Sequence, residues 1–121
     1  MQVQSFRQLV VWQKSMDLVD RVYDLTSRFP GEERYGLASQ VRRCSVSIPS
    51  NIAEGQLRGT RNDYARFISI AFGSSGELQT QLIISFRRKY ISEEDYMQVL
   101  SLLTEVMKML GALHKKLKPR T

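Results

Sequence analysis

The stretch SIPSNIAEGQLRGT, residues 47–60, decides how the fold is predicted. A proline, Pro49, and a carboxylate, Glu54, lie among small residues inside a sequence whose flanks have helical spacing. Such a stretch is compatible with a catalytic loop, a phosphate-binding turn or a helix bent for a packing reason. A proline inside a helix lacks the amide hydrogen and crowds the preceding turn, and helix kinks commonly have such a local cause. We interpret the stretch as a helix kinked at Pro49.

Apolar residues recur at helical spacing in four blocks, which predict helices over about residues 6–28, 33–59, 61–88 and from 93 onward. A serine or threonine followed three residues later by an acidic or amide side chain is typical of a helix start. The sequence has this pattern at Ser5, Thr60 and Ser92. Connections of a few residues cannot return the chain to its starting end, so consecutive helices must run in opposite directions. The predicted fold is all-α: a single domain, residues 1–121, built as an antiparallel up-down-up-down four-helix bundle.

The composition limits the class of protein. With 18 lysine and arginine residues against 12 acidic ones, the formal charge is +6, which favours nucleic acid first and an anionic membrane second as partners. No apolar run approaches the roughly 20 residues that a membrane span requires, and the N-terminal sequence is unlike a signal peptide. A single cysteine, Cys44, cannot form an internal disulfide. We therefore expect a soluble cytoplasmic protein with no membrane partner.

Several blocks are apolar on more than one side of their predicted helix. LVVW, residues 9–12, runs around the first helix, and FISIAF, residues 67–72, nearly does so on the third. Helices of this kind are usually buried on more than one side. Two interpretations stay open: a generous monomer core, or self-association, which we favour because large apolar patches are uncommon on soluble monomers.

Antiparallel pairing of the second and third helices about the turn at residues 59–60 places residues whose numbers sum to about 119 at the same height. Glu54 then lies level with Arg66, and Glu77 lies level with Arg42 and its neighbour. Ion pairs are therefore expected across this helix pair. Small residues on both helices also predict a close approach of the two backbones, at Ser45, Ser47 and the run 72–76.

The sequence presents no group of residues suited to catalysis, a metal or a cofactor. It lacks both the GxxxxGK[ST] phosphate loop and the Glu-x-x-His pairs of di-iron bundles. Cys44 and the only histidine, His114, fall at different levels of the predicted bundle, so a Cys-His pair is not expected. Glu54 and Glu77 are also far apart along the helices, and ion pairing explains them better than acid-base chemistry. We predict no catalytic residue, no metal and no cofactor, and expect that the protein is not an enzyme.

Basic residues gather at one end of the predicted bundle, where only Glu54 and Asp63 oppose them: Arg7, Arg58, Arg61, Arg66, Lys115, Lys116, Lys118 and Arg120. At the other end, cations and carboxylates roughly balance. A lysine and arginine cluster with little acid is expected of a protein that binds a phosphate backbone. The alternative is a solvated helix end followed by a flexible basic tail, predicted over residues 115–121.

Three segments together resemble the bacterial four-helix-bundle family of 23S rRNA intervening sequence proteins: FRQLVVWQKSMDL, FPGEERYGLASQVRRCSVSIPSNIAEG and DYARFISIAFGSSGELQTQL. More distantly, the chain is similar to the accessory variability determinant (Avd) proteins of diversity-generating retroelements. The resemblance implies a small helical bundle that is not an enzyme, and a homo-oligomer, with a pentamer favoured. The positions that match the family's structural signature are Ser47, Pro49, Asn51, Glu54, Gly55, Gly73, Ser74, Glu77 and Leu78.

The chain departs from the family pattern at two points. Gly76 stands where a larger residue is expected, and FRRKYIS, residues 86–92, is more basic than the usual continuation. The second departure leaves Arg87-Arg88-Lys89 as another candidate binding surface. The leading hypothesis is a homo-oligomeric bundle that binds structured RNA by charge and shape. The alternative is a protein-interaction scaffold, such as an accessory factor of a reverse transcriptase.

Overall fold

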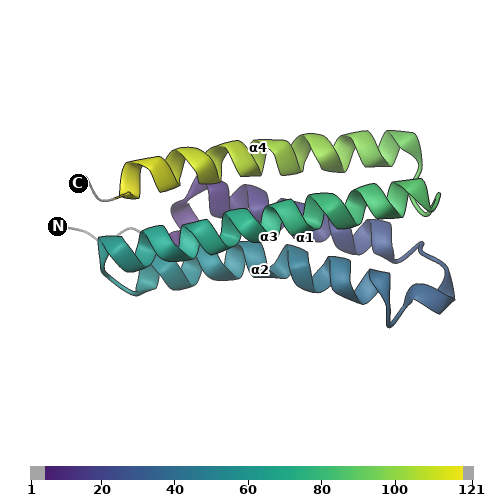
Figure 1. Cartoon of the computed structure of the whole chain (residues 1–121), viewed down its shortest axis with the longest axis horizontal. Helices are drawn as coiled ribbons and strands as arrows, with labels where there is room; N and C mark the ends of the chain where they lie inside the picture. The colour runs from purple at the N-terminus through teal and green to yellow at the C-terminus, as the bar shows by residue number, and fades with distance from the viewer. Residues whose placement is uncertain (1–4, 119–121) are drawn as a thin grey trace.

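The computed structural model of the chain describes residues 5–118, and all regular elements in this range are helical. Four long helices follow one another along the chain, with a short 3-10 helix before each of the first two (Figure 1). Their bounds are η1 Phe6–Gln8, α1 Val10–Thr26, η2 Gly31–Glu33, α2 Leu37–Leu57, α3 Arg61–Arg87 and α4 Glu93–Leu117. The prediction of an all-α helical bundle is confirmed.

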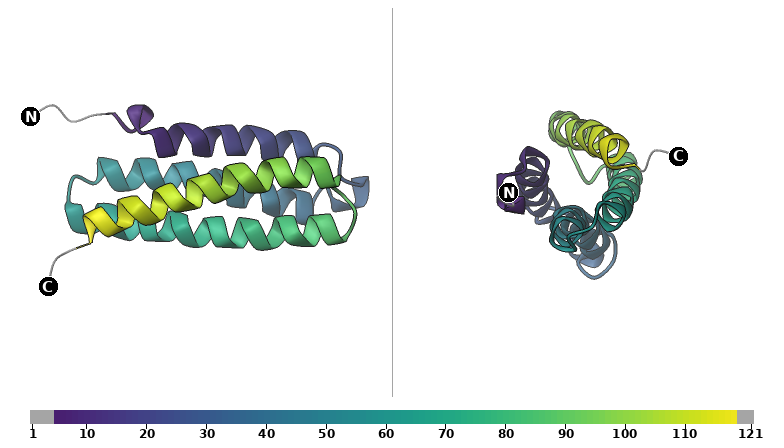
Figure 2. Two further views of the ribbon diagram at one scale, coloured as in Figure 1. Left: turned by 90° about the horizontal axis from the view of Figure 1, so that it is seen from above. Right: turned by 90° about the vertical axis from the view of Figure 1, so that its left-hand side faces the viewer.

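The four long helices pack side by side around a common core, with α1 opposite α3 and α2 opposite α4 (Figure 2). Contacts between α1 and α4 fix their relative direction. Lys14 Nζ lies 2.7 Å from Glu105 Oε1, and Arg28 Nη2 lies 3.0 Å from Asp95 Oδ2. Residue numbers rise along one helix as they fall along the other, so α1 and α4 run antiparallel.

Each helix contributes one apolar stripe to the core, and its largest fully buried side chains are Leu18, Val22, Val41, Ile48, Ile52, Ile68, Leu78, Leu82, Val99, Leu103, Val106 and Leu110. The sequence of α1 contains two apolar stripes, and only one of them is buried in the core. Leu18 and Val22 are buried, whereas Met16 and Tyr23 are 37% and 44% exposed. The bundle therefore leaves apolar surface on the outer side of α1.

The first two predicted helices begin later than expected. Leu9 has extended backbone, with ψ of 124°, and separates η1 from α1. At the start of α2, Gly36 has non-helical backbone and precedes the first helical residue, Leu37. The Glu33 carboxylate accepts a hydrogen bond from the Leu37 amide at 3.2 Å. A capping carboxylate at this position satisfies a donor that the first turn of α2 cannot pair.

The starts of α3 and α4 agree with the predicted caps. Thr60 Oγ1 accepts from the Asp63 amide at 3.1 Å, and Ser92 Oγ accepts from the Asp95 amide at the same distance. Gly59 has φ of +84°, a conformation that favours glycine, and it turns the chain between α2 and α3.

Pro49 lies inside α2, which continues through it as one helix from residue 37 to residue 57. The predicted kink at this residue stays a prediction. Within residues 5–118, none of the helices combines the length and the apolar character needed to cross a membrane.

Candidate nucleic-acid interface

The basic residues singled out from the sequence come from η1, the end of α2, the start of α3 and the end of α4. These segments lie at one end of the bundle (Figure 1). We call this surface the basic pole and define it as Arg7, Arg58, Arg61, Arg66, Lys115, Lys116 and Lys118. Arg120, also predicted to belong to it, lies outside the described residues.

The end of α4 carries two lysines of the basic pole, Lys115 and Lys116, and the third, Lys118, follows the helix directly. The helix extends to Leu117, and the Lys118 amide donates to the His114 carbonyl at 2.9 Å. Residues 115–117, which were predicted to begin a flexible tail over residues 115–121, are the last residues of α4, and residues 119–121 lie outside the described residues. The sequence of α4 contains no proline, and the first proline after it is Pro119. A residue that precedes proline usually has extended backbone, as Lys118 has here with ψ of 130°.

Arg61 connects the start of α3 to the end of α4. Its Nε donates to the Leu117 carbonyl at 3.2 Å, and its Nη2 donates to the Lys116 carbonyl. The last carbonyls of a helix have no partner within the helix and carry partial negative charge, so a guanidinium satisfies both needs. Arg61 thus has a structural role that was not predicted from the sequence. The sequence feature that could have indicated this role is the position of Arg61 on the first turn of α3, beside the last turn of α4.

Arg58 and Arg66 lie over the same aromatic ring. Their guanidinium carbons are 5.0 Å and 4.5 Å from the centroid of Phe67. Each also pairs with a carboxylate on its own helix: Arg58 with Glu54 at 2.9 Å, and Arg66 with Asp63 at 3.6 Å. The predicted pair between Glu54 and Arg66 was wrong, because partners three or four residues away on one helix are within easier reach.

The remaining cations of the basic pole have no counter-charge among residues 5–118. The side chains of Arg7, Lys115, Lys116 and Lys118 are exposed and form no ion pair there. Arg87, Arg88 and Lys89, the alternative surface, are likewise exposed but lie at the other end of the bundle. At the basic pole, free positive charge is concentrated on the last turn of α4 and on η1.

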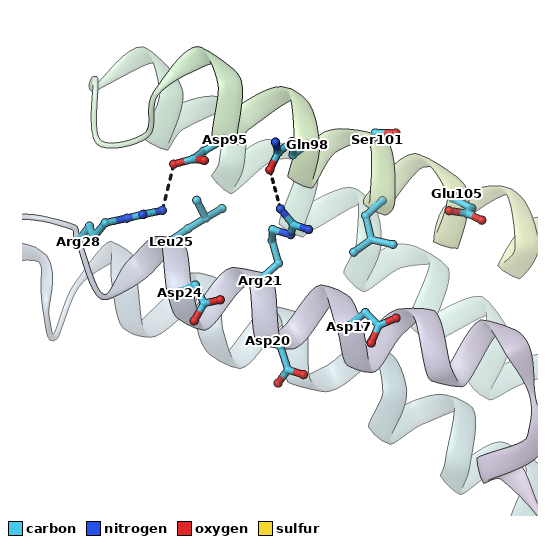
Figure 3. Close-up of a pocket in the computed structure, with 11 residues that line it drawn as sticks. Asp17, Asp20, Arg21, Asp24, Leu25, Arg28, Asp95, Gln98, Ser101 and Glu105 are labelled. Atoms are coloured by element: carbon cyan, nitrogen blue, oxygen red, sulfur yellow. Dashed lines mark hydrogen bonds and ion pairs between the residues drawn. The ribbon is translucent and has the colours of Figure 1, made fainter.

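Carboxylates gather away from the basic pole, in a groove of about 710 Å³ between α1 and α4 (Figure 3). Two contacts bridge this groove, Arg28 to Asp95 and Arg21 Nη1 to Gln98 Oε1 at 2.7 Å. The acidic residues that line it are Asp17, Asp20, Asp24, Asp95 and Glu105. Across the described part of the chain, no three histidine, cysteine or acidic side chains converge as a metal site would require.

The family signature on α2 is held by hydrogen bonds to carbonyls. Ser47 Oγ donates to the Cys44 carbonyl at 2.6 Å, and Asn51 Nδ2 donates to the Ser47 carbonyl at 2.7 Å. One contact reaches across to α3, where Cys44 Sγ donates to the Ser74 carbonyl at 3.1 Å. This contact agrees with the predicted antiparallel register of α2 and α3.

Only one glycine of the signature brings the two helices together. A Cβ atom on Gly55 would lie 2.7 Å from Phe67 Cβ and 3.3 Å from Tyr64 Cδ1. A Cβ atom on Gly73 or Gly76 would meet no atom within 4 Å. The prediction that residues 72–76 allow a close backbone approach was therefore wrong for these glycines. Both lie on the side of α3 that does not pack on α2.

Cys44 is a core residue, as predicted. Its side chain is buried, and burial, with a smaller effect of the Glu77 charge, raises the pKa of the thiol to about 12. The thiol is therefore protonated at neutral pH, which is unsuited to a nucleophile.

Glu77 was expected to pair with Arg42 or Arg43, but among the described residues it forms neither ion pair. It accepts instead from Gln81 Nε2 at 3.3 Å. Arg42 turns toward α1, where Nε donates to Thr26 Oγ1 at 2.7 Å.

The sequence pattern of 23S rRNA-intervening sequence proteins matches residues 7–112. A solved structure, described as a protein with unknown function from the S23 ribosomal protein family of Bacteroides thetaiotaomicron VPI-5482, superimposes with a TM-score of 0.82. The two sequences are 27% identical, and the match covers 88% of this chain and 99% of that chain. Comparison with curated protein sequences gives no match. Because the family pattern spans most of the chain, this protein belongs to the 23S rRNA-intervening sequence protein family.

Proposed function

We propose that the protein is a non-enzymatic, homo-oligomeric, cytoplasmic bundle that binds structured RNA through its basic pole. One observation carries the proposal: exposed cations without counter-charges lie together at one end of the bundle, on η1 and the last turn of α4. The groove rich in carboxylates lies away from this end, between α1 and α4, so a polyanion is repelled from one surface and attracted to the other.

Arg61 supports the proposal by fixing the helix end that carries the lysines. Because its guanidinium binds the carbonyls of Lys116 and Leu117, the last turn of α4 stays helical close to the start of α3. Cations carried on a fixed backbone lose less backbone conformational entropy on binding than cations on a free chain. The basic pole is therefore suited to the fixed spacing of phosphates in a folded RNA.

The test is a titration of labelled structured RNA at several salt concentrations. Each phosphate contact contributes a slope of about −0.9 for a duplex and about −0.7 for a single strand to the plot of log K against log salt. We expect the triple variant Lys115→Gln, Lys116→Gln, Lys118→Gln to weaken binding and flatten this slope.

The matched control is Arg87→Gln, Arg88→Gln, Lys89→Gln, which removes the same charge from the opposite end. Binding that is absent at low salt, or equally weakened by the two triple variants, would contradict the assignment to the basic pole.

Self-association is supported by apolar surface that one subunit leaves exposed. A groove of about 320 Å³ between α1 and α2 is lined mainly by apolar side chains: Trp12, Met16, Val19, Val46, Pro49 and Ala53. Single exposed apolar residues are ordinary, but a contiguous patch is typical of an interface. We propose a pentamer, the state implied by the resemblance to Avd proteins. Light scattering measures the mass in solution, and a monomer at all concentrations would contradict this part of the proposal.

A protein-interaction scaffold is the second candidate, and the outer side of α3 favours it. Four large apolar residues of α3 stay partly exposed in one subunit: Ile70, Phe72, Ile83 and Ile84, each 40–43% exposed. If this surface binds a reverse transcriptase or another protein, a purified complex must survive nuclease treatment and be lost in Ile70→Ser, Ile84→Ser.

A further inference from the structure

A second cationic site lies at the end of the bundle opposite the basic pole. It is a cavity of about 360 Å³ between the last turn of α1, the connection that follows and the first turns of α2. The lining residues that matter here are Thr26, Ser27, Phe29, Pro30, Arg34 and Arg42. Two arginines and two hydroxyl groups thus surround a hollow whose remaining wall is largely apolar.

Arg42 is held in place by contacts that leave its terminal nitrogens unused. Its Nε donates to Thr26 Oγ1 at 2.7 Å, and its guanidinium lies 4.8 Å from the centroid of the Tyr23 ring. The Thr26 hydroxyl donates its own proton to the Val22 carbonyl at 2.7 Å, which fixes it as an acceptor toward Arg42. The guanidinium is therefore oriented before any ligand arrives.

No counter-charge reaches the two arginines. Within residues 5–118, neither Arg34 nor Arg42 forms an ion pair, and no carboxylate lines the cavity. The nearby Glu33 is engaged elsewhere, since it accepts from the Leu37 amide and from Tyr90 Oη at 2.9 Å. Arg42 is partly buried, and a charge removed from water without a partner is destabilising, so an anion in the cavity would relieve that cost.

We propose that this cavity binds a phosphate group, held between the guanidinium groups of Arg34 and Arg42. Guanidinium presents its donors in a planar fork that matches phosphate oxygens, and two of them balance a phosphate dianion. The site is separate from the RNA-binding surface proposed for the basic pole and does not depend on it. The phosphate has two sources, a free phosphate or phosphomonoester and the backbone of an RNA, and both present the same chemistry.

Calorimetric titration of the full chain with inorganic phosphate tests the proposal, at fixed ionic strength set by chloride. We expect Arg34→Gln to weaken phosphate binding by at least about tenfold, the loss expected for one charged hydrogen bond. Arg42→Gln should do the same, but it also removes contacts with Thr26 and Tyr23. Arg34 is exposed and its guanidinium carbon lies 5.6 Å from the centroid of the exposed Tyr35 ring, so Arg34→Gln keeps the test valid if Arg42→Gln fails to fold.

Arg87→Gln is the control, because it removes an exposed arginine of α3 that lines no part of the cavity. An equal loss in Arg87→Gln and Arg34→Gln would overturn the proposal, and so would absence of phosphate binding. A second arm adds an RNA oligonucleotide without terminal phosphates. Competition with inorganic phosphate assigns the site to backbone phosphates, and lack of competition assigns it to a free phosphate group. Phosphate affinity that is unchanged in the triple lysine variant separates this site from the basic pole.

Discussion

The two halves of the family signature contain similar small residues but contact different surroundings. On α2, the side chains of Ser47 and Asn51 donate to neighbouring carbonyls, and Gly55 lies against Phe67 and Tyr64 of α3. On α3, Gly73 and Gly76 face open space. A close approach of two helices therefore needs a small residue on only one of them, at the position where a large side chain of the other must fit. Of the small residues of this run of α3, only the two glycines face open space, since Ser75 is fully buried and the Ser74 carbonyl accepts from Cys44.

The largest effect is expected from Gly55→Ala. The added Cβ would lie 2.7 Å from Phe67 Cβ, which is attached directly to the α3 backbone and cannot rotate away. Overpacking of this kind costs about 1–3 kcal/mol, more than the gain of roughly 1 kcal/mol in helix propensity. Urea unfolding followed by circular dichroism measures the change. A stability equal to that of the unmodified chain would show that α2 and α3 are not in close contact here.

The second effect concerns Cys44, a buried residue of α2 that precedes the signature. Burial raises the pKa of its thiol from the ordinary value of 9.0 to about 12, so the folded state favours the protonated thiol. This contribution is complete below pH 9 and is lost as the pH rises toward 12, with a slope of at most about 1.4 kcal/mol per pH unit. Cys44→Ala should remove this part of the alkaline loss. Unfolding curves between pH 8 and pH 11 that remain parallel for the two chains would contradict it.

Gly73→Ala should have the opposite sign to Gly55→Ala. Because its Cβ meets nothing within 4 Å, the substitution should stabilise the subunit through helix propensity and a less flexible unfolded chain, by about 0.4–1 kcal/mol. The measurement is made at a dilution where light scattering shows single subunits. A loss of stability under those conditions would mean that α3 is covered within the subunit at Gly73.

The smallest effect on subunit stability is expected from Ile84→Ser, on the outer side of α3. This side chain is 43% exposed, and surface substitutions usually change the free energy of unfolding by less than about 0.5 kcal/mol. The mass in solution is the sharper measurement. Because self-association is proposed at the α1–α2 groove, the mass of Ile84→Ser should equal that of the unmodified chain. A lower mass would contradict this and place α3 in the interface between copies.

Local sequence signals predicted the parts of the fold that depend on local chemistry. Thr60 and Ser92 cap their helices as predicted, and the register of α2 and α3 agrees with the contact between Cys44 and Ser74. The break at Leu9 could not be predicted, because it interrupts a continuous helical pattern. Two apolar stripes on α1 satisfied the same periodicity, and only packing against α2 and α4 selects the stripe that contains Leu18.

The candidate site was predictable in composition but not in detail. The clustering of cations at one end follows from helix direction alone. Which of them are free depends on side-chain contacts: Arg58 and Arg66 are engaged with carboxylates and Phe67, and Arg61 with the end of α4. One arginine of the phosphate cavity was also placed differently: Arg42 was expected to pair with Glu77 and turns to Thr26 instead.

The contact between Arg61 and the end of α4 has a consequence for local opening. Helix ends usually fray, and amide hydrogens in a last turn then exchange rapidly with solvent. Here the carbonyls of Lys116 and Leu117 are held by a side chain of another helix, so the last turn of α4 can open only when the contact to α3 breaks. Amide protection at the end of α4 should therefore follow that of the start of α3, and the two segments should exchange as one cooperative unit.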